Sequence, residues 1–436
     1  MQSVKVGLLG LGTVGQGTAV ICQRNATEIA RRAGRGIEIK AALVRDLDKA
    51  SRLGMDHIAL TNNSDDLIYD PEIEIIAEMM GGDEPARSLV LAAIEQGKHV
   101  VTANKALIAI HGNEIFAAAR EKGVVVAFEP AVAGGIPVIK AVREGLTANR
   151  ISWLAGIING TGNFILTEMT EKNRDFADVL AEAQALGYAE ADPTFDVEGI
   201  DAAHKLTILA SIAFGIPLQF DHVYTEGISE ITRADVAFAE ELGYRIKHLG
   251  IARESDVGIE LRVHPTLIPE KRLIANVNGV MNAVLVHADA VGPTLYYGPG
   301  AGSEPTGSAV VADLVDTVRT LTTDPENRVP HLAFQSDLLS DKPMLASEDF
   351  RSAYYLRLLA EDRPGVLAEV THIMGELGIS IEAIIQKEPA EGSTEVPVIM
   401  LTRDVREGLV NEAITRIEKL KTIREKVTRI RVETLG

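Results

Sequence analysis

The pattern of apolar and polar positions over the first part of the chain predicts strands that alternate with helices. Short, almost wholly apolar runs are separated by stretches in which apolar residues recur with helical spacing. A first strand is expected over Val4–Leu9, followed by a helix from Val14 to about Ala33. Further strands are expected over Ile37–Val44, Ile73–Met79, Lys98–Thr102 and Gly123–Phe128, and helices over Pro85–Gln96 and Gly112–Glu121. Such alternation predicts an α/β domain with a doubly wound parallel sheet.

From about Ala141 the pattern becomes typical of an α+β domain. A strand is expected over Ile151–Ile158, followed by a glycine-rich turn at Asn159–Asn163. The other expected elements are helices over Asp175–Leu186, Gly199–Phe214 and Ser308–Leu321, and strands over Ile259–Leu267, Gly279–His287 and Asp289–Leu295. This mixture of elements predicts a second domain of a different class.

The end of the chain has its own pattern, after an expected linker with little periodicity. The elements expected there are strands over Ala353–Ala360, Ile379–Lys387, Val396–Thr402 and Thr428–Val432, and helices over Gly365–Leu377 and Arg406–Leu420. The order βαββαβ is that of a ferredoxin-like domain. The predicted boundaries are residues 1–140 for the first domain, completed by about 298–320, then 141–297 for the second, 321–350 for the linker and 351–436 for the third.

The composition limits the classes of partner. The chain has 436 residues and a net charge of −19, which argues against nucleic acids and anionic membranes because both demand a basic surface. The single cysteine, Cys22, excludes a disulfide within the chain and suits a reducing compartment. The sequence has neither a signal-peptide pattern nor an unbroken apolar run of about 20 residues. We therefore expect a soluble, cytoplasmic protein with a small-molecule substrate.

A glycine-rich motif after the first strand indicates a dinucleotide site. It consists of Gly10, Leu11, Gly12, Thr13, Val14 and Gly15, and it matches G-x-G-x-x-G in the strand–turn–helix context of a Rossmann-like fold. Glycines let the backbone approach a pyrophosphate, and the helix N-terminus attracts its charge. The alternative is a tight turn that binds no ligand.

The residues after the second strand bear on the choice between cofactors. Arg45 could pair with the 2′-phosphate of NADP, whereas Asp46 could accept a hydrogen bond from a ribose hydroxyl of NAD. We favour NADP and keep NAD as an alternative, and both side chains could instead lie in a solvated loop without a ligand.

The sequence VVTANK places polar residues at the carboxyl end of a parallel strand, where ligands bind in such folds. We expect Thr102 to contact the cofactor, and Lys105 to contact the cofactor or a substrate carboxylate. The alternative for Lys105 is a solvated lysine that follows a strand.

The segment GIDAAHKLTILA contains the main catalytic candidate. Asp201 and Lys205 are four residues apart, so they share one face of the expected helix. An ordinary surface ion pair is the alternative. Catalysis is favoured by the core-like residues that follow Lys205 and by the carboxylates upstream, which are Glu190, Asp192, Asp196 and Glu198. A lysine in a partly dry cleft can exchange its proton more easily, and Asp201 could orient it.

The chemistry that these residues support is hydride transfer between an alcohol and a carbonyl. Oxidation of an aldehyde through a thioester needs a cysteine nucleophile, whereas Cys22 is expected to pack within the first helix. No H-E-x-x-H motif or cysteine cluster suggests zinc, so a lysine would have to polarise the carbonyl.

Six segments, in the same order, closely resemble the homoserine dehydrogenase family: GLLGLGTVG, VVTANKALIA, FEPAVAGGIPVI, INGTGNFIL, EADPTFDVEGIDAAHKLTILA and GPGAGSEPTGSAVVADL. The resemblance spans roughly residues 4–320, and the tail YYLRLLAEDRPGVLAEVTHIMGELGISIEAI resembles an ACT domain. Together they are similar to the monofunctional bacterial form with one C-terminal ACT module. The resemblance implies reversible NAD(P)H-dependent reduction of L-aspartate 4-semialdehyde to L-homoserine, in threonine, methionine and isoleucine biosynthesis.

The resemblance also implies roles for single residues. Lys205 would donate a proton to the aldehyde oxygen with the support of Asp201, and Lys105 would lie near both cofactor and substrate. Glu190 and Asp196 would hold the substrate's amino group, and we expect Gly160 and Thr161 to contact the substrate too. Gly302 would join Gly10–Gly15 at the cofactor, and a monovalent cation, usually sodium, is implied at Glu129, Val132, Gly134 and Ile136. For Glu129 the alternative is a carboxylate that only caps the end of a strand.

The ACT module implies feedback inhibition, with L-threonine as the expected effector. The helix N-terminus that follows Pro364 could hold an amino acid's carboxylate, and the expected contacts are Asp362, Gly365, Val366 and Leu367. The alternative is an ACT domain that only dimerises. Similar proteins form homodimers or homotetramers, and we expect one of these assemblies here.

Two other functions are also consistent with the sequence. The chain could be a non-catalytic nucleotide and amino-acid sensor, against which Lys105, Glu190, Asp201 and Lys205 argue. It could also be a dehydrogenase of another small amino or hydroxy acid, because the acid cluster fits an amino group without selecting one substrate.

Overall fold

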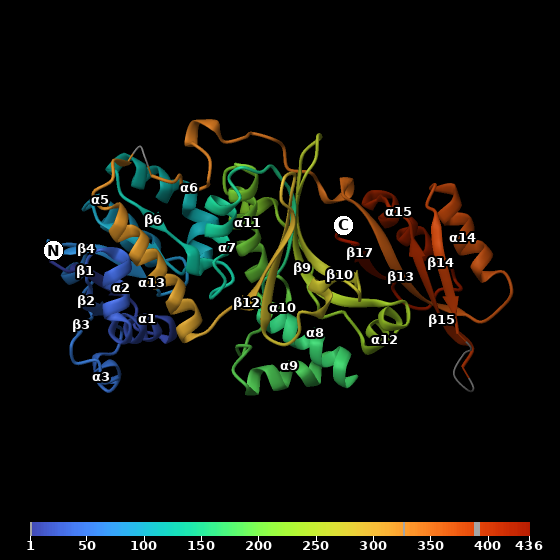
Figure 1. Ribbon diagram of the computed structural model, residues 1–436. Coiled ribbons are helices and arrows are strands. Elements are labelled where there is room, and N and C mark those ends of the chain that lie inside the picture. Colours follow the sequence, from blue (N-terminus) through green and yellow to red (C-terminus); the bar gives the residue numbers. More distant parts are fainter. Residues whose placement is uncertain (1, 326–327, 388–392) are drawn as a thin grey trace. The chain divides into compact units, whose positions relative to one another are not determined.

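The computed structural model describes residues 2–325, 328–387 and 393–436 (Figure 1). The chain forms two compact units, each built from three separate segments. Unit 1 comprises Met1–Gly160, Asp201–Val223 and Val280–Lys342, and unit 2 comprises Thr161–Ile200, Tyr224–Gly279 and Pro343–Gly436. Each unit therefore depends on contacts between distant parts of the sequence.

Unit 1 contains the predicted parallel sheet. Its strands are β1 (Val4–Leu9), β2 (Ile37–Leu43), β3 (Ala59–Thr61), β4 (Ile73–Glu78), β5 (His99–Thr102) and β6 (Val126–Ala127), in the order β3-β2-β1-β4-β5-β6. All neighbouring strands are parallel. The central strands β1 and β4 are buried on both faces, which explains their nearly continuous apolar runs. This strand order is that of dinucleotide-binding folds and confirms the predicted class.

The helices of this part are α1 (Thr13–Arg24), α2 (Ala26–Ala33), α3 (Leu47–Ser51), α4 (Asp65–Ile68), α5 (Ala86–Glu95), α6 (Lys105–Lys122) and α13 (Ser303–Thr320). The single helix expected up to Ala33 is wrong. It is divided at Asn25, whose N–H closes α1 on the Ile21 carbonyl and whose own carbonyl starts α2. Helix α6 starts earlier than expected because the Asn104 side chain caps it, accepting from the N–H of Leu107. Among the described residues no helix is long and apolar enough to cross a membrane.

Helix α13 comes from late in the chain and packs against α1 (Figure 1). Glycines permit the close approach, because a Cβ at Gly17 would lie 2.2 Å from the carbonyl oxygen of Ser303, and one at Gly307 would lie 2.8 Å from the nitrogen of Thr18. The Ser303 hydroxyl donates to the carbonyl of Thr13 at 2.8 Å. The start of α13 is thereby held beside the glycine turn that precedes α1.

The rest of unit 1 contains an antiparallel sheet and one long buried helix. The sheet has the order β12-β11-β7, formed by β7 (Ile151–Ile157), β11 (Met281–Ala288) and β12 (Gly292–Pro299). Helix α11 (Ile200–Phe214) is buried at nearly every position. Short helical turns connect β6 to β7, namely η1 (Glu129–Ala131), α7 (Val138–Lys140) and the π-helical η2 (Ala141–Gly145).

Unit 2 starts with elements from the middle of the chain. They are α8 (Gly160–Lys172), α9 (Phe176–Ala185), α10 (Thr194–Val197), β8 (Tyr224–Thr225), α12 (Arg233–Glu241), β9 (Tyr244–Glu254) and β10 (Ile259–Pro269). The turn expected at Asn159–Asn163 is wrong, because Gly160 onward forms the first turn of α8. Strand β9 was not expected, and its buried residues include Lys247. The Lys247 ammonium group donates to the Val277 carbonyl at 2.6 Å, which satisfies one of its hydrogen bonds.

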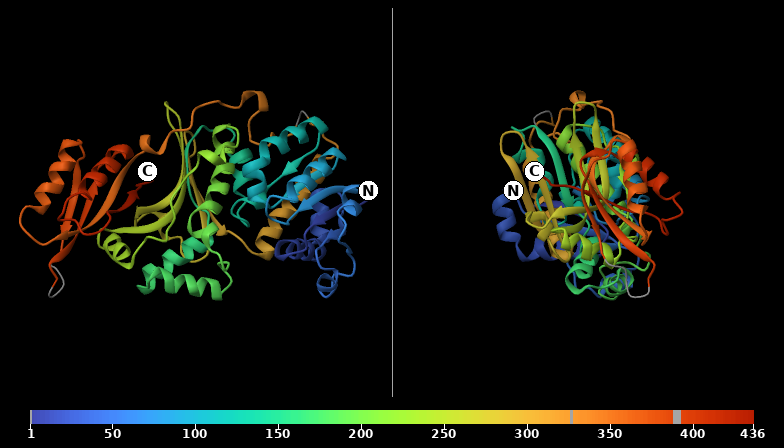
Figure 2. Two further views of the ribbon diagram at one scale, coloured as in Figure 1. Left: turned by 180° about the vertical axis from the view of Figure 1, so that it is seen from behind. Right: turned by 90° about the vertical axis from the view of Figure 1, so that its right-hand side faces the viewer.

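The end of the chain forms the predicted βαββαβ arrangement. Its elements are β13 (Arg351–Glu361), α14 (Val366–Glu376), β14 (Ile381–Gln386), β15 (Glu395–Thr402), the short β16 (Val405–Arg406), α15 (Glu407–Ile417) and β17 (Thr428–Val432). The strand order β17-β13-β15-β14 is antiparallel, and α14 and α15 cover one face of it (Figures 1 and 2). The ferredoxin-like class is confirmed.

The other face of these strands is not free. Tyr355 and Ile430 belong to the same apolar core as Leu166 of α8 and Val236 of α12. Strand β17 also pairs in parallel with β10. The C-terminal domain therefore shares both a sheet and a core with the middle segments of unit 2.

Candidate active site

Three side chains of unit 1 form a charged group around one carboxylate, which we call the lysine cluster (Lys105, Asp201 and Lys205). The Lys205 ammonium group donates to Asp201 Oδ2 at 2.7 Å and to the carbonyl of Ile158 at 2.7 Å. The Lys105 ammonium group lies 2.9 Å from Asp201 Oδ1. Each carboxylate oxygen therefore holds a different lysine.

Local structure explains how these side chains meet. Asp201 and Lys205 are four residues apart on α11, and their direct contact confirms the predicted shared face. Lys105 is the first residue of α6, after the Asn104 cap that ends the β5 loop. Ile158 follows β7. The cluster therefore joins two helices and the end of one strand.

The cluster is largely shielded from water and carries a net positive charge. The side chains of Asp201, Lys205 and Lys105 are 4%, 12% and 35% exposed. Burial alone would raise the pKa of Asp201, but the charges of Lys205 and Lys105 more than offset it and hold the pKa below its usual range. Two cations around one ionised carboxylate leave a positive charge next to the most exposed member, Lys105.

Sequence reasoning missed two partners of this cluster. The Asn159 side chain donates to Asp201 Oδ2 at 2.8 Å, so that oxygen binds both an amide and the Lys205 ammonium group. The Ile158 carbonyl is the second acceptor for Lys205. Asn159 lies within the segment INGTGNFIL, but we interpreted its polarity only as part of a turn.

A neutral histidine lies on the same helix. The His204 ring stacks on Phe220 with centroids 4.2 Å apart and planes 12° from parallel. Burial, opposed by Asp201 and assisted by Lys105 and Lys205, lowers the pKa of His204 to about 4. His204 is therefore uncharged near neutral pH and does not supply a cation.

The glycine turn has the geometry that a pyrophosphate needs. Gly10 has a φ of +105°, and a Cβ at Gly15 would lie 2.4 Å from the carbonyl oxygen of Gly10. Gly12 caps α1, and the space where its Cβ would stand has no atom within 4 Å. Leu11, Thr13 and Val14 complete the turn and the start of α1. The open backbone at a helix N-terminus fits a dinucleotide.

The two candidates after β2 have different environments. The Asp46 side chain caps α3 by accepting from the N–H of Lys49 at 2.9 Å. Arg45 is exposed. Asp46 therefore has a structural role of its own, whereas Arg45 is available to an anionic group.

Thr102 fixes the loops at the carboxyl ends of two neighbouring strands. Its hydroxyl donates to Glu78 Oε2 at 2.6 Å and accepts from the N–H of Asn104 at 3.0 Å. Glu78 Oε1 accepts from the N–H of Met80 at 2.8 Å. Burial raises the pKa of Glu78, against the opposing effect of these hydrogen bonds. Gly302, with a φ of +130°, is the N-cap residue of α13. Helix α13 starts beside the glycine turn, where the Ser303 hydroxyl donates to the Thr13 carbonyl.

The segment expected to bind a cation contains an unusual pair of buried carboxyl groups. The Glu129 carboxylate accepts from the N–H groups of Ile139 at 2.9 Å and Lys140 at 2.7 Å, and so caps α7. The Glu129 N–H donates to Asp313 Oδ2 at 2.8 Å. Burial raises the pKa of Glu129 to about 7, and burial and then Glu129 raise that of Asp313 to about 8.

Two adjacent buried carboxyl groups favour a nearby cation. Hard cations take carboxylate and carbonyl oxygens, which this segment can supply. Val132 follows η1, Gly134 has a φ of +42°, and Ile136 is buried. The donor chemistry therefore fits a monovalent cation. Asp313, on α13, was not among the predicted residues.

The remaining substrate candidates lie along the chain before α11. Thr161 is buried on α8, where its hydroxyl donates to the carbonyl of Tyr188 at 2.5 Å. Glu190 is exposed, and Asp196 is half-buried on α10. Gly160 starts α8, where a Cβ would lie 2.8 Å from the carbonyl oxygen of Val280. Thr161, Glu190 and Asp196 belong to unit 2, whereas the lysine cluster belongs to unit 1.

The predicted effector residues lie at the turn between β13 and α14. Gly365 caps α14 with a φ of +95°, and Asp362 and Gly365 are exposed. Val366 is buried and Leu367 half-buried. The turn thus presents the N-terminus of an 11-residue helix, and the exposed Asp362 precedes it by four positions in the sequence.

Comparison with known proteins reveals the family. Models described as "Homoserine dehydrogenase, NAD binding domain", "Homoserine dehydrogenase" and "ACT domain" match residues 10–129, 137–315 and 354–422. The chain is 67% identical to a homoserine dehydrogenase of Pseudomonas aeruginosa over 436 residues, which is 100% of both chains. A homoserine dehydrogenase crystal structure from Thiobacillus denitrificans has a TM-score of 0.96 and 65% identity, again with 100% of both chains covered. A hyperthermophilic archaeal homoserine dehydrogenase in complex with NADPH has a TM-score of 0.64 and 25% identity, over 74% of this chain and 100% of that one. This chain belongs to the homoserine dehydrogenase family.

Proposed function

We propose that the protein catalyses the reversible NAD(P)H-dependent reduction of L-aspartate 4-semialdehyde to L-homoserine. The observation that carries this proposal is the lysine cluster, in which one buried carboxylate orients two lysines. Asp201 is held ionised by the two lysines, so the lysines are the members of the cluster that carry a proton to donate. Family membership supplies the substrate, and the cluster supplies the chemistry.

Lys205 is the proposed acid. The nicotinamide supplies a hydride to the aldehyde carbon when the cofactor is bound. The Lys205 ammonium group donates its proton to the aldehyde oxygen, which becomes the hydroxyl of homoserine, and the resulting amine regains a proton from water. In the oxidation direction the amine accepts the hydroxyl proton.

Asp201 and Lys105 have supporting roles in this proposal. Asp201 Oδ2 and the Ile158 carbonyl restrict the Lys205 ammonium group to one position, since each accepts from it at 2.7 Å. Lys105 is held on the other carboxylate oxygen at 2.9 Å and keeps 35% of its side chain exposed. Its exposure suits contact with the substrate or cofactor.

The proposed contacts to the substrate come from the region before α11. Glu190 and Asp196 would bind the amino group, directly or through water, because carboxylates pair with an ammonium group. Gly160 and Thr161 would line the same site. The hydroxyl of Thr161 is bound to the carbonyl of Tyr188, two positions before Glu190, which ties these candidates to one another within the chain.

NADP is the proposed preferred cofactor. The exposed Arg45 would pair with the 2′-phosphate, while Asp46 is engaged as the cap of α3. Gly10–Gly15 and Gly302 would surround the pyrophosphate, and Thr102 would hold the neighbouring loop. NAD is the alternative.

A sodium ion is proposed at Glu129, Val132, Gly134 and Ile136. It would offset the charge of Glu129 and Asp313 and so keep the connection between β6 and β7 rigid. The support is the buried pair of acids, in which the Glu129 backbone N–H donates to Asp313 Oδ2 at 2.8 Å.

L-threonine is the proposed inhibitor, with its carboxylate at the N-terminus of α14 and its amino group near Asp362. The shared core and the β17–β10 pairing of unit 2 offer a physical connection from this domain to the middle segments. A truncation of the C-terminal domain would remove part of this shared core, so an Asp362→Ala variant is a better test. We expect this variant to keep its turnover and to lose its response to threonine.

The domain boundaries are proposals as well: residues 1–140 with about 298–320, 141–297, 321–350 and 351–436. We also propose that the protein is a homodimer or a homotetramer, and sedimentation equilibrium would distinguish the two.

The assay that tests the function uses the purified full chain with L-homoserine, at alkaline pH with sodium present. We expect homoserine-dependent formation of reduced nicotinamide, faster with NADP than with NAD at equal low concentration. L-serine and 4-hydroxybutyrate, which lack chain length or the amino group, should be poor substrates. Turnover of another acid alone would favour a different dehydrogenase, and cofactor binding without turnover would favour a sensor.

A further inference from the structure

Unit 1 contains a large cavity apart from the lysine cluster and the glycine turn. Its volume is about 1200 Å³, which exceeds that of a small-molecule pocket. It lies along β6, the edge strand of the parallel sheet, between α6, α13, η2 and residues 324–325 and 328–339. No residue of the lysine cluster or of Gly10–Gly15 lines it.

One wall of the cavity is aromatic. The ring of His331 stacks on Phe116 with centroids 4.7 Å apart and planes 10° from parallel. His331 Nε2 accepts from the N–H of Val126 at 3.3 Å, so the ring also closes the free edge of β6. Pro330 and Leu332 extend this apolar surface.

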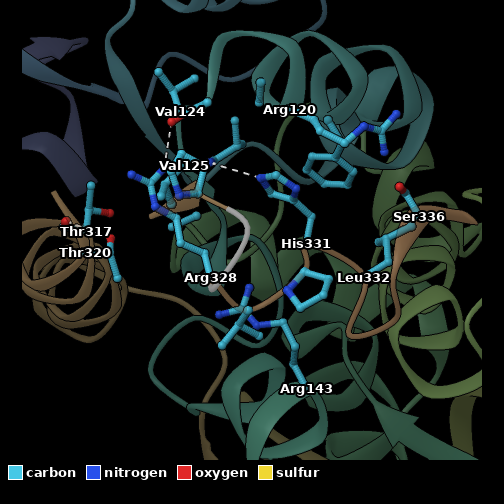
Figure 3. A pocket seen from close by; sticks show the side chains of 18 of the residues that line it. Arg120, Val124, Val125, Arg143, Thr317, Thr320, Arg328, His331, Leu332 and Ser336 are labelled. Carbon is cyan, nitrogen blue, oxygen red and sulfur yellow. Dashed lines mark hydrogen bonds between the residues drawn. The ribbon is translucent and has the colours of Figure 1, made fainter. Parts of the chain in front are cut away.

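Three arginines surround the His331 ring, as Figure 3 shows: Arg120 from α6, Arg143 from the π-helical η2, and Arg328 from the segment after α13. Burial, together with these three charges, lowers the pKa of His331 to about 4, so the ring is neutral and adds no positive charge. Arg120 and Arg328 form no ion pair with any described carboxylate. Among the described residues that line the cavity, six cations face five acids, so the lining has a small positive excess.

Five described acids line the cavity, and the charge of one of them, Asp324, acts on Arg328. Asp316 is paired with Lys140 and, at 2.8 Å, with Arg319. Glu144 pairs with Arg143 at 3.0 Å, and Asp313 accepts from the N–H of Glu129.

Two guanidinium nitrogens point to a missing partner. The Nε atoms of Arg143 and Arg328 are buried and have no hydrogen-bond acceptor among the described residues. Buried donors are nearly always satisfied by an acceptor, from protein, water or a ligand. Arg143 also lies on a π-helical turn. Such turns are rare in proteins as a whole, and those that occur are often found at functional sites.

We propose that this cavity binds a small organic anion with a flat, apolar body. Its carboxylate, phosphate or sulfonate group would lie against Arg143 and Arg328, because guanidinium groups bind such anions with paired donors. Its ring would stack beside Phe116 and His331. This site is separate from the dinucleotide turn, which follows β1 at the carboxyl end of the sheet.

Anilinonaphthalene sulfonate is a suitable probe, since it is flat, apolar, anionic and fluorescent when bound. The titration uses the full chain saturated with NADP, so that the dinucleotide turn is occupied. We expect one saturable site under these conditions. The affinity should fall at least about tenfold in Arg143→Met/Arg328→Met and in Val329→Trp, which fills space at the half-exposed rim of the cavity. The charge-matched control Arg31→Met, on the exposed face of α2, should bind as the wild type does.

Two results would overturn the proposal. One is the absence of saturable probe binding to the protein that is already saturated with NADP. The other is unchanged affinity in variants that unfold at the wild-type temperature. If the double arginine variant fails to fold, Val329→Trp decides alone, because it leaves every arginine in place.

Discussion

Two of the protein's charged clusters differ in burial and in charge balance. The lysine cluster of unit 1 holds two cations on one carboxylate, and Lys105 keeps 35% of its side chain exposed. The arginine cluster of unit 2 balances two cations with two carboxylates, and the Arg431 side chain is fully buried; its members are Glu226, Glu407, Arg429 and Arg431. Arg431 contacts Glu226 at 2.9 Å and Glu407 through Nε at 2.8 Å. The first cluster has surplus positive charge on a partly exposed lysine, whereas the second is balanced in charge around the buried Arg431.

This difference indicates a functional role for the lysine cluster and a structural role for the arginine cluster. A buried, balanced ion pair adds little net stability, but removal of one partner leaves an uncompensated charge and is costly. The arginine cluster connects β17 and α15 to Glu226, which follows β8. It therefore fixes the C-terminal domain to the middle segments. A partly exposed cluster with surplus charge is instead typical of a site.

The largest effect is expected for Lys205→Met, which keeps the side-chain length and removes the acid. The kcat for homoserine oxidation should fall by about 10³ to 10⁴, the range of general acid–base catalysis. The dissociation constant for NADP should change less than about twofold. Lys49→Met, an exposed lysine of α3, is the control and should keep its kcat. An equal loss of kcat in Lys49→Met would show that the effect is not specific to the lysine cluster.

Arg431→Met tests the architectural cluster. It should lower the free energy of unfolding by about 3–5 kcal/mol, because Glu226 and Glu407 are left with one arginine. Urea denaturation measures the loss, and the kcat of the folded fraction should stay within about twofold. Arg431→Met with Glu407→Leu should recover part of the stability. A drop in kcat at unchanged stability would contradict the assigned role.

Acid sensitivity of unit 1 is the third test. The folded-state pKa of His204 is about 4, below its ordinary value of 6.5, so the unfolded chain binds a proton first as the pH falls. Stability should therefore be lost between about pH 6.5 and pH 4, and His204→Phe should reduce the loss between about pH 6.5 and pH 5 by about 2 kcal/mol. Urea denaturation at the two pH values measures it. His57→Phe, an exposed histidine, should leave the loss unchanged.

The smallest effect concerns the amide on Asp201. Asn159→Ala removes a hydrogen bond of 2.8 Å and should lower kcat/KM about five- to tenfold, which corresponds to about 1 kcal/mol. Asn411→Ala is the matched change in the arginine cluster, where Asn411 accepts from Arg429, and it should leave kcat/KM unchanged. Steady-state kinetics of both variants would distinguish them. A greater loss of kcat/KM in Asn411→Ala than in Asn159→Ala would contradict the roles assigned to the two clusters.

The sequence predicted what depends on local spacing. Period and length gave the parallel sheet, and the four-residue spacing gave the Asp201–Lys205 contact. It did not reveal the Lys105–Asp201 contact, which needs α6 and α11 to meet. Asp313 was missed for a similar reason, because it lies 184 positions from its partner Glu129.

Local patterns also misled where tertiary contacts decide. Asn25 breaks a helix without a glycine or proline at that position to mark it. Strand β9 contains the buried Lys247, and carbonyl and amide oxygens from two other segments surround its ammonium group. Such partners come from distant positions, and no short window of sequence contains them.

Chemical rescue tests the central claim, that Lys205 transfers the proton, most directly. Homoserine oxidation by Lys205→Ala is measured with increasing concentrations of small primary amines. The account predicts that added amine restores turnover and that the restored rate depends on the pKa of the amine, as for any general base. Wild-type turnover in Lys205→Ala without amine would contradict it, and so would a folded, cofactor-binding variant that no amine activates.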